Sequence, residues 1–204
     1  MSYRGGGDYR GSGYGGGGGG PDGLILNELR IDHSGADNDE FFELKGDPNA
    51  SLDGYAVIAI GDGAVGSGAI ESISLLDGYQ LNAEGYFVGA KSTFTLGIPD
   101  GIFDDLQFEN SDTVTIFLVL NFTGELGGDI DVDDDGVIDS FFWDEIQDGV
   151  TILETCEEPP TTTEWGYAAV VVPPDGIYAA GGIFRCEPSG DWTVGGFSFG
   201  DYSQ

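Results

Sequence analysis

Short apolar runs separated by turn residues fill the sequence from residue 24 onward. The runs are rich in β-branched and aromatic residues, and Gly, Asp, Asn and Pro lie between them. This pattern predicts strands at residues 24–31, 40–44, 55–60, 70–75, 86–90, 113–120, 150–153, 168–172, 183–186 and 192–194. No stretch keeps a helical period over three turns. Many short strands at nearly even spacing predict an all-β domain, a β-sandwich or a barrel.

Two runs are apolar without alternation, residues 117–120 (FLVL) and 170–172 (VVV). Because both faces of such a strand are apolar, we expect these runs to be central strands that are covered on both sides. Asp-Gly steps, among them those at residues 53–54, 62–63 and 77–78, predict the turns between strands.

Residues 1–23 are a low-complexity segment dominated by glycine, with a few tyrosines and two arginines. Ordering glycine costs backbone entropy, and this segment has little apolar surface to bury. We expect a flexible tail or linker at 1–23 and one folded domain at 24–204. The alternative is a segment that is ordered against a neighbouring subunit.

Residues 129–139 (DIDVDDDGVID) hold six aspartates and one glycine. Like charges this dense repel one another, and a divalent cation removes the repulsion. The spacing is similar to the first nine positions of a calcium-binding EF-hand loop. It predicts side-chain or carbonyl oxygen ligands at Asp131, Asp133, Asp135, Val137 and Asp139.

The similarity to an EF-hand loop is incomplete. The twelfth position of such a loop carries a bidentate glutamate, whereas Phe142 occupies it here. The alternative interpretation of residues 129–139 is therefore a solvated acidic turn without a cation.

The net charge is extreme, because 37 acidic residues outnumber 6 basic ones and give a formal charge of -31. Such a surface repels phosphate backbones and anionic lipid, which argues against nucleic-acid binding. It suits divalent cations, basic partners or a saline medium. No apolar run is long enough for a membrane span, and no secretion signal is visible.

The chain has two cysteines, Cys156 and Cys186. An even number in an acidic domain suited to calcium makes a disulfide between them plausible. The alternative is two buried thiols. A zinc site is not favoured, because His33 is the single histidine and no Cys-x-x-Cys pair occurs.

Three glutamates fall on predicted strands beside apolar residues: Glu28, Glu40 and Glu43. A buried carboxylate without a partner is costly. We expect hydrogen bonds to these carboxylates. The alternatives are ion pairs with Arg30 or Lys45, and a second cation site that includes Asp37 and Asp39.

Residues 25–31 (ILNELRI), 37–44 (DNDEFFEL) and 52–55 (LDGY) together resemble the lamin tail domain family. Later segments extend the resemblance, namely GYFV at 85–88, NSDTV at 110–114, and RC at 185–186 followed by GDW at 190–192. The resemblance covers about residues 24–201.

The resemblance implies an immunoglobulin-like β-sandwich of the kind found in nuclear lamins and on bacterial and archaeal extracellular proteins. The aspartate-rich insertion resembles that of versions which accompany secreted nucleases and phosphatases. The resemblance therefore implies an extracellular or cell-surface location for this chain.

No motif in the sequence indicates catalysis. His33 lies in a polar turn without a nucleophile-elbow motif, and paired carboxylates are unavoidable in so acidic a chain. Six aromatic residues offer either a sugar-stacking face or core packing, the commoner outcome: Tyr55, Tyr79, Trp143, Trp165, Tyr167 and Trp192.

We therefore expect a non-catalytic, calcium-binding β-sandwich that acts as an extracellular interaction or structural module. We expect a protein partner or self-association. One alternative is a self-assembling fibre or surface-layer subunit whose Gly-rich N-terminal segment contacts a neighbour. The other is an accessory domain of a secreted nuclease or phosphatase.

Overall fold

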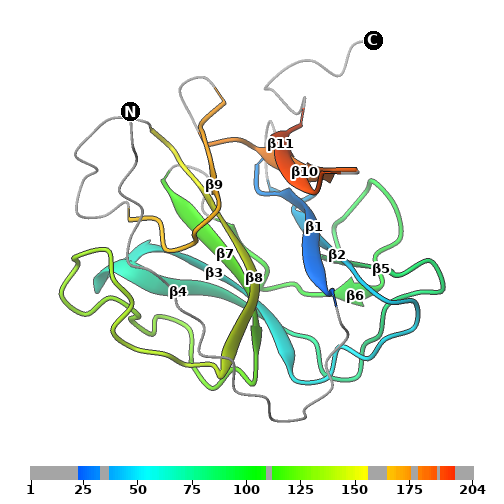
Figure 1. Cartoon of the computed structure of the whole chain (residues 1–204), viewed down its shortest axis with the longest axis horizontal. Coiled ribbons are helices and arrows are strands. Elements are labelled where there is room, and N and C mark those ends of the chain that lie inside the picture. Colours follow the sequence, from blue (N-terminus) through cyan, green and yellow to red (C-terminus); the bar gives the residue numbers. More distant parts are fainter. Residues whose placement is uncertain are drawn as a thin grey trace.

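A computed structural model of the chain describes residues 23–32, 37–108, 112–155, 165–175, 179–187 and 189–195. In this part of the chain there are eleven strands and no helix (Figure 1). The strands are β1 (Ile25–Arg30), β2 (Phe41–Lys45), β3 (Tyr55–Gly63), β4 (Gly66–Leu75), β5 (Tyr86–Ala90), β6 (Gly101–Ile102), β7 (Val114–Leu120), β8 (Glu145–Ile152), β9 (Val171–Val172), β10 (Gly182–Cys186) and β11 (Asp191–Val194).

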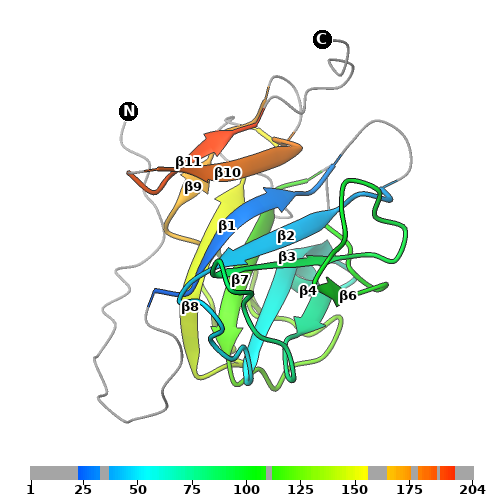
Figure 2. The same ribbon diagram turned by 90° about the vertical axis from the view of Figure 1, so that its right-hand side faces the viewer.

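The strands form two sheets that pack face to face. One has six strands in the order β11-β10-β1-β2-β5-β6, and the other has five in the order β4-β3-β7-β8-β9. Figure 2 shows β1 and β2 crossing in front of β7 and β8. Neighbouring strands are antiparallel except for the short pairs β5–β6 and β8–β9. The predicted all-β class and the β-sandwich architecture are thus confirmed.

The β3–β4 hairpin is longer than the sequence predicts. The Asp-Gly step at residues 62–63 was expected to be a turn, but Asp62 pairs with Ser67 and the turn lies at residues 64–65. The glycines of β4 permit this extension, because Gly66 and Gly68 have φ of 108° and 88°. The end of the hairpin then contacts the aspartate-rich loop, as described below.

The main core lies between the two sheets. Alternate residues of the central strands point into it, including Val57 and Ala59 of β3 and Ile116 and Leu118 of β7. Apolar area removed from water stabilises the fold by about 25 cal/mol per Å².

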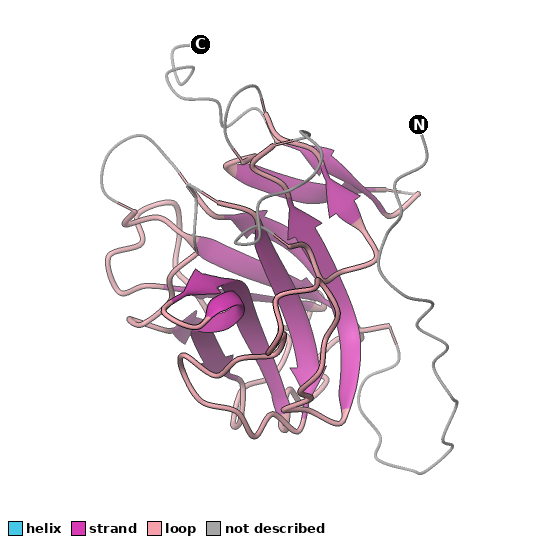
Figure 3. Ribbon diagram, turned by 90° about the vertical axis from the view of Figure 1, so that its left-hand side faces the viewer, coloured by secondary structure: helices cyan, strands magenta, loops and turns pink. Residues whose placement is uncertain are grey.

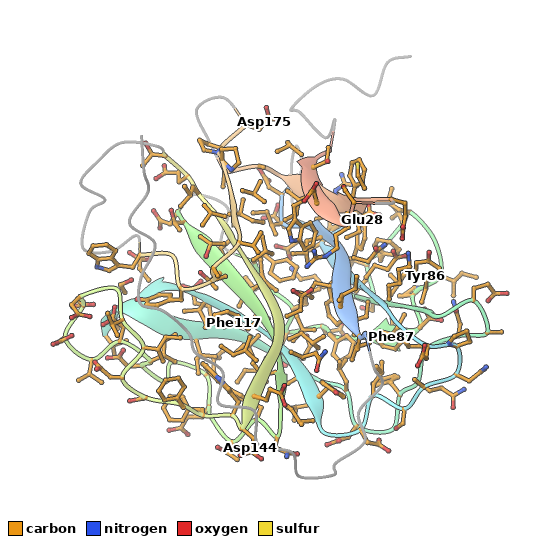
Figure 4. The ribbon with its side chains drawn as sticks, in the orientation of Figure 1. Glu28, Tyr86, Phe87, Phe117, Asp144 and Asp175 are labelled. Carbon is orange, nitrogen blue, oxygen red and sulfur yellow. The ribbon has the colours of Figure 1, made fainter. Side chains whose placement is uncertain are left out.

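A second core covers the outer face of the five-stranded sheet. It contains the other residues of the same strands, such as Ile58 of β3 and Phe117 of β7. Phe87 and Phe117, which are labelled in Figure 4, belong to different cores. The run at residues 117–120 is thus a central strand with both faces covered, as expected.

The loop between β7 and β8 supplies most of the cover for this second core. Ile130, Ile138 and Trp143 of the loop are buried in it, and Tyr167 joins them. Figure 3, which views the molecule from this side, shows loops and turns passing in front of the strands. The aspartate-rich loop is therefore packed onto the sheet by its apolar residues.

The prediction that residues 170–172 form a central strand covered on both faces is wrong. Only residues 171 and 172 are in a strand, the two-residue β9, which lies at the edge of its sheet, and residue 170 precedes it. Val170 and Val171 are exposed, and Val172 alone of the three joins the main core. A continuous apolar run does not show whether its strand is central, with both faces covered, or lies at an edge. The strand order of the sheet determines which of the two occurs.

The six aromatic residues do not gather on one face. Tyr55 lies in the main core, and Tyr79 and Trp192 pack against it. The other three, Trp143, Trp165 and Tyr167, lie in or against the second core. This division supports core packing and not a single sugar-stacking surface.

Candidate metal site in the aspartate-rich loop

Backbone hydrogen bonds attach the start of the aspartate-rich loop to β4. Asp129 forms an antiparallel bridge with Ala69, and the N–H of Ile130 donates to the carbonyl of Gly68 at 3.0 Å. Asp139 then returns, donating its N–H to the Ile130 carbonyl at 2.7 Å. The loop is thus closed between Ile130 and Asp139, with its aspartates held in between.

Asp131 is the buried centre of the loop, with 0% of its surface exposed. Its Oδ1 accepts the N–H of Asp135 at 3.1 Å, and its Oδ2 accepts the N–H of Gly136 at 2.8 Å. The phenolic hydroxyl of Tyr167 also donates to Oδ2, at 2.8 Å. These three donors offset the cost of burying the carboxylate.

Asp131, Asp133 and Asp139 converge. One carboxylate oxygen from each lies within 4.8 Å of the others, so the three can hold a metal ion. Asp133 and Asp139 are exposed to solvent, which leaves the cluster open on one side. In the described part of the chain this is the one such group. The prediction of a metal site in this loop is supported to that extent.

Two of the predicted ligands stand outside this group of three. The Oδ1 of Asp135 accepts the N–H of Val137 at 2.9 Å and closes a local turn. Val137 is half exposed, and its predicted ligand is a backbone carbonyl. The roles of these two residues as ligands stay predictions.

Electrostatic repulsion within the loop is concentrated on Asp133. Its pKa is raised above the ordinary value, first by the charge of Asp135, then by a small loss of hydration, and then by the charges of Asp139 and Asp131. A raised carboxyl pKa means that the neighbours oppose ionisation. A bound cation would reverse that effect, because it favours the ionised form.

The sequence pattern offers Tyr167 for a sugar-stacking face or for core packing, but does not predict that it belongs to the metal site. It lies 36 positions after Asp131 and is 8% exposed, with its hydroxyl also 2.7 Å from Ser67 Oγ. Burial is the main cause that raises its pKa, and Asp131 adds to it. The hydroxyl therefore stays protonated as a donor. Nothing in the sequence around residue 167 indicated this contact.

Asp134 and Trp165 also contact the loop at this site, and the sequence does not predict these contacts. Asp134 has a φ of 55°, a left-handed conformation that aspartate tolerates better than most residues. Its Oδ1 accepts the N–H of Ser67 at 2.7 Å, and its carbonyl accepts the indole N–H of Trp165 at 2.9 Å. The indole lies against Gly136, where φ is 83°.

The glutamates on β1 and β2 have protein partners. Glu40 accepts from the N–H of Phe108 at 3.1 Å and pairs with Lys91 at 2.5 Å. Glu43 accepts from the side-chain amide of Asn27 at 2.6 Å. The predicted hydrogen bonding is therefore confirmed for these two glutamates. The ion pair of Glu40 is formed with Lys91, which the sequence does not indicate as a partner.

The proposed second cation site has less support. Asp39 accepts hydrogen bonds from Thr95, and Lys45 pairs with Glu187. Burial and the charge of Glu43 raise the pKa of Glu28. The group of side chains that could hold a metal among the described residues includes none of those proposed for the second site, which are Glu28, Glu40, Glu43, Asp37 and Asp39.

The predicted disulfide joins a described and an undescribed residue. Cys186 lies on β10 with its Sγ 3.1 Å from Thr193 Oγ1, and it has no disulfide partner among the described residues. Cys156 lies outside the described residues, as do His33 and the low-complexity residues 1–22. The disulfide and the role of the N-terminal segment stay predictions.

Comparisons of the chain with protein-family models, with curated proteins and with solved structures gave no match. The resemblance to lamin tail domains is therefore untested. In the part of the chain that the structure describes, no helix has the length and apolar character needed to cross a membrane.

Proposed function

We propose that this protein is a non-catalytic, calcium-binding β-sandwich that acts outside the cell as an interaction or structural module. The observation that supports it is the convergence of Asp131, Asp133 and Asp139 in one loop. Aspartate oxygens are the ligands that calcium prefers, whereas zinc prefers cysteine and histidine. Calcium takes six to eight oxygens, so waters and further loop oxygens would complete its coordination.

The loop's position explains how calcium would act. The same loop carries Ile130 and Ile138, which cover the outer core of the five-stranded sheet. Without a cation, repulsion among the aspartates works against this packing. With calcium bound, the charges are neutralised, and the binding energy adds to the stability of the folded state. The cation would thus stabilise the sandwich without any catalytic role.

The acidic surface is consistent with an interaction module. A net charge of -31 disfavours nucleic acid and anionic membranes as partners and favours basic proteins or a second protein bridged by cations. The extracellular setting has the millimolar calcium that weak extracellular sites use.

A calcium titration of the thermal unfolding temperature tests the proposal. We expect the melting temperature of the wild-type chain to rise with calcium, and to rise less with magnesium, which demands a tighter octahedral site. Sodium chloride at matched ionic strength separates site binding from general screening.

Two variants identify the site. The double variant Asp133→Asn, Asp139→Asn should lose the calcium response. The control variant Asp105→Asn removes one charge from an exposed turn outside the aspartate-rich loop, and it should keep the calcium response. The proposal fails if calcium up to about 10 mM, above the weakest affinities of extracellular modules, leaves the wild-type melting temperature unchanged.

A further inference from the structure

The hydroxyl of Tyr167 is part of a directional chain of hydrogen bonds. A carboxylate can only accept, so the phenol donates its proton to Asp131 Oδ2 at 2.8 Å. The phenolic oxygen is then the acceptor for Ser67, whose Oγ lies 2.7 Å away. Ser67 is 1% exposed, so water does not compete for its hydroxyl.

The five-stranded sheet, and not the loop, sets the position of Tyr167. The N–H of Tyr167 donates to Thr115 Oγ1 of β7 at 3.0 Å, and the next N–H, of Ala168, donates to Thr151 Oγ1 of β8 at 3.0 Å. The two threonine hydroxyls are fully buried and lie 2.9 Å apart. The phenol therefore reaches Asp131 from a support that is independent of the aspartates.

Asp131 in turn determines the path of the loop. Its two carboxylate oxygens accept the N–H groups of Asp135 and Gly136, so the orientation of one side chain fixes the turn that follows. If the carboxylate rotated, both N–H groups would lose their acceptor.

We propose that Tyr167 is the positioning residue of the aspartate-rich loop and holds Asp131 in the orientation that a cation requires before any cation binds. The effect on calcium affinity rests on the proposed function, whereas the effect on loop order does not. Tyr167 is not a ligand in this proposal. Its hydroxyl orients a ligand and pre-arranges the loop, which lowers the ordering cost of binding.

The test compares Tyr167→Phe with Tyr55→Phe. Each variant removes one hydroxyl from a buried tyrosine, but Tyr55 lies in the main core between the sheets. Hydrogen exchange of the Asp135 and Gly136 amides is measured by NMR in the presence of a chelator. We expect faster exchange at these two amides in Tyr167→Phe and no change there in Tyr55→Phe.

Calcium affinity is then measured by calorimetry on the same proteins. Loss of a group that orients a metal ligand typically weakens binding by about 10- to 100-fold. We expect a loss in that range for Tyr167→Phe and an unchanged affinity for Tyr55→Phe. Ser67→Ala, which leaves phenol and carboxylate in place, should give a smaller loss in the same direction.

Each outcome decides something. Unchanged exchange at the two amides in Tyr167→Phe would overturn the inference. If wild-type protein does not bind calcium, the proposed function fails and the exchange measurement alone decides the role of Tyr167. If Tyr167→Phe does not fold, Ser67→Ala is used in its place. Wild-type hydrogen exchange and wild-type calcium affinity in Ser67→Ala would then reject the proposed chain of hydrogen bonds.

Discussion

Arg185 on β10 and Asp148 on β8 link the two sheets. One guanidinium nitrogen donates to both carboxylate oxygens of Asp148, at 2.9 and 2.7 Å. Between them lies Leu26 of β1, where the strand is irregular. Its N–H donates to Asp148 and its carbonyl accepts from Arg185 Nε. The ion pair thus satisfies backbone groups of β1 while it joins β8 to β10.

The first prediction concerns this link. Asp148→Asn keeps the size of the side chain but removes the charge, and leaves the mostly buried guanidinium of Arg185 without its counterion. We expect the free energy of unfolding to fall by about 1.5–3 kcal/mol, the range for hydrogen bonds to charged groups. Urea unfolding measures the change. Asp191→Asn, at an exposed position on β11, is the control, and equal stability of the two variants would contradict the prediction.

The second prediction uses two glycines with nearly the same backbone conformation. Gly136 has a φ of 83° and Gly78 a φ of 84°. A left-handed conformation costs an alanine about 1–2 kcal/mol at either position. A Cβ at Gly136 would also lie 2.8 Å from the Trp165 ring, whereas one at Gly78 meets nothing within 4 Å.

We therefore expect Gly136→Ala to be less stable than Gly78→Ala and, unlike it, to weaken the calcium response. Thermal unfolding with and without calcium provides both measurements. If the two variants behave alike, then Trp165 does not pack on the loop as the structure shows.

The third prediction tests whether the loop is packed or merely tethered. Ile138 is 9% exposed and belongs to the second core, whereas its neighbour Val137 is 50% exposed. Ile138→Ala should lower the free energy of unfolding by about 2–3 kcal/mol. Val137→Ala should change it by less than about 0.5 kcal/mol, as for surface positions in general. The free energy of unfolding of both variants is measured with denaturant in the presence of a chelator. Equal losses in the two variants would show that Ile138 is not packed in the second core.

The fourth prediction concerns pH and the buried carboxyl group of Glu40. Its pKa is raised from 4.5, because burial opposes ionisation more than Lys91 and the N–H of Phe108 favour it. The folded state therefore binds the proton more tightly than the unfolded state just above pH 4.5. The contribution of Glu40 to stability is greatest at low pH and declines as the pH rises through that window.

In Glu40→Gln the side chain at position 40 cannot ionise. The difference in stability between the wild type and this variant therefore isolates the contribution of Glu40. We expect the stability of the wild type relative to Glu40→Gln, measured by urea unfolding, to decrease as the pH rises above 4.5. Asp53 gives the opposite sign, because the N–H of Gly78 lowers its pKa. Relative to Asp53→Asn, the wild type should lose stability as the pH falls. If the stability differences from Glu40→Gln and from Asp53→Asn changed in the same direction with pH, the opposite pKa shifts of Glu40 and Asp53 would be contradicted.

Local sequence was sufficient for most of the strands and for the position of the acidic loop. Residues 86–90 were predicted as a strand and are β5. Apolar alternation and Asp-Gly steps act over a few residues, so they can be recognised without knowing the fold. The longer course of β8 was not predicted, because residues 145–149 are largely polar and form a strand through their pairing with β7.

The sequence by itself determined that the chain builds sheets and that carboxylates crowd into one short segment, because both follow from neighbouring residues. Only the tertiary structure decided that Tyr167 and Trp165 meet that segment, that Arg185 reaches Asp148, and that residues 170–172 lie at an edge. These contacts join positions far apart in the chain. They depend on strand order and on how the sheets pack, which local composition does not specify.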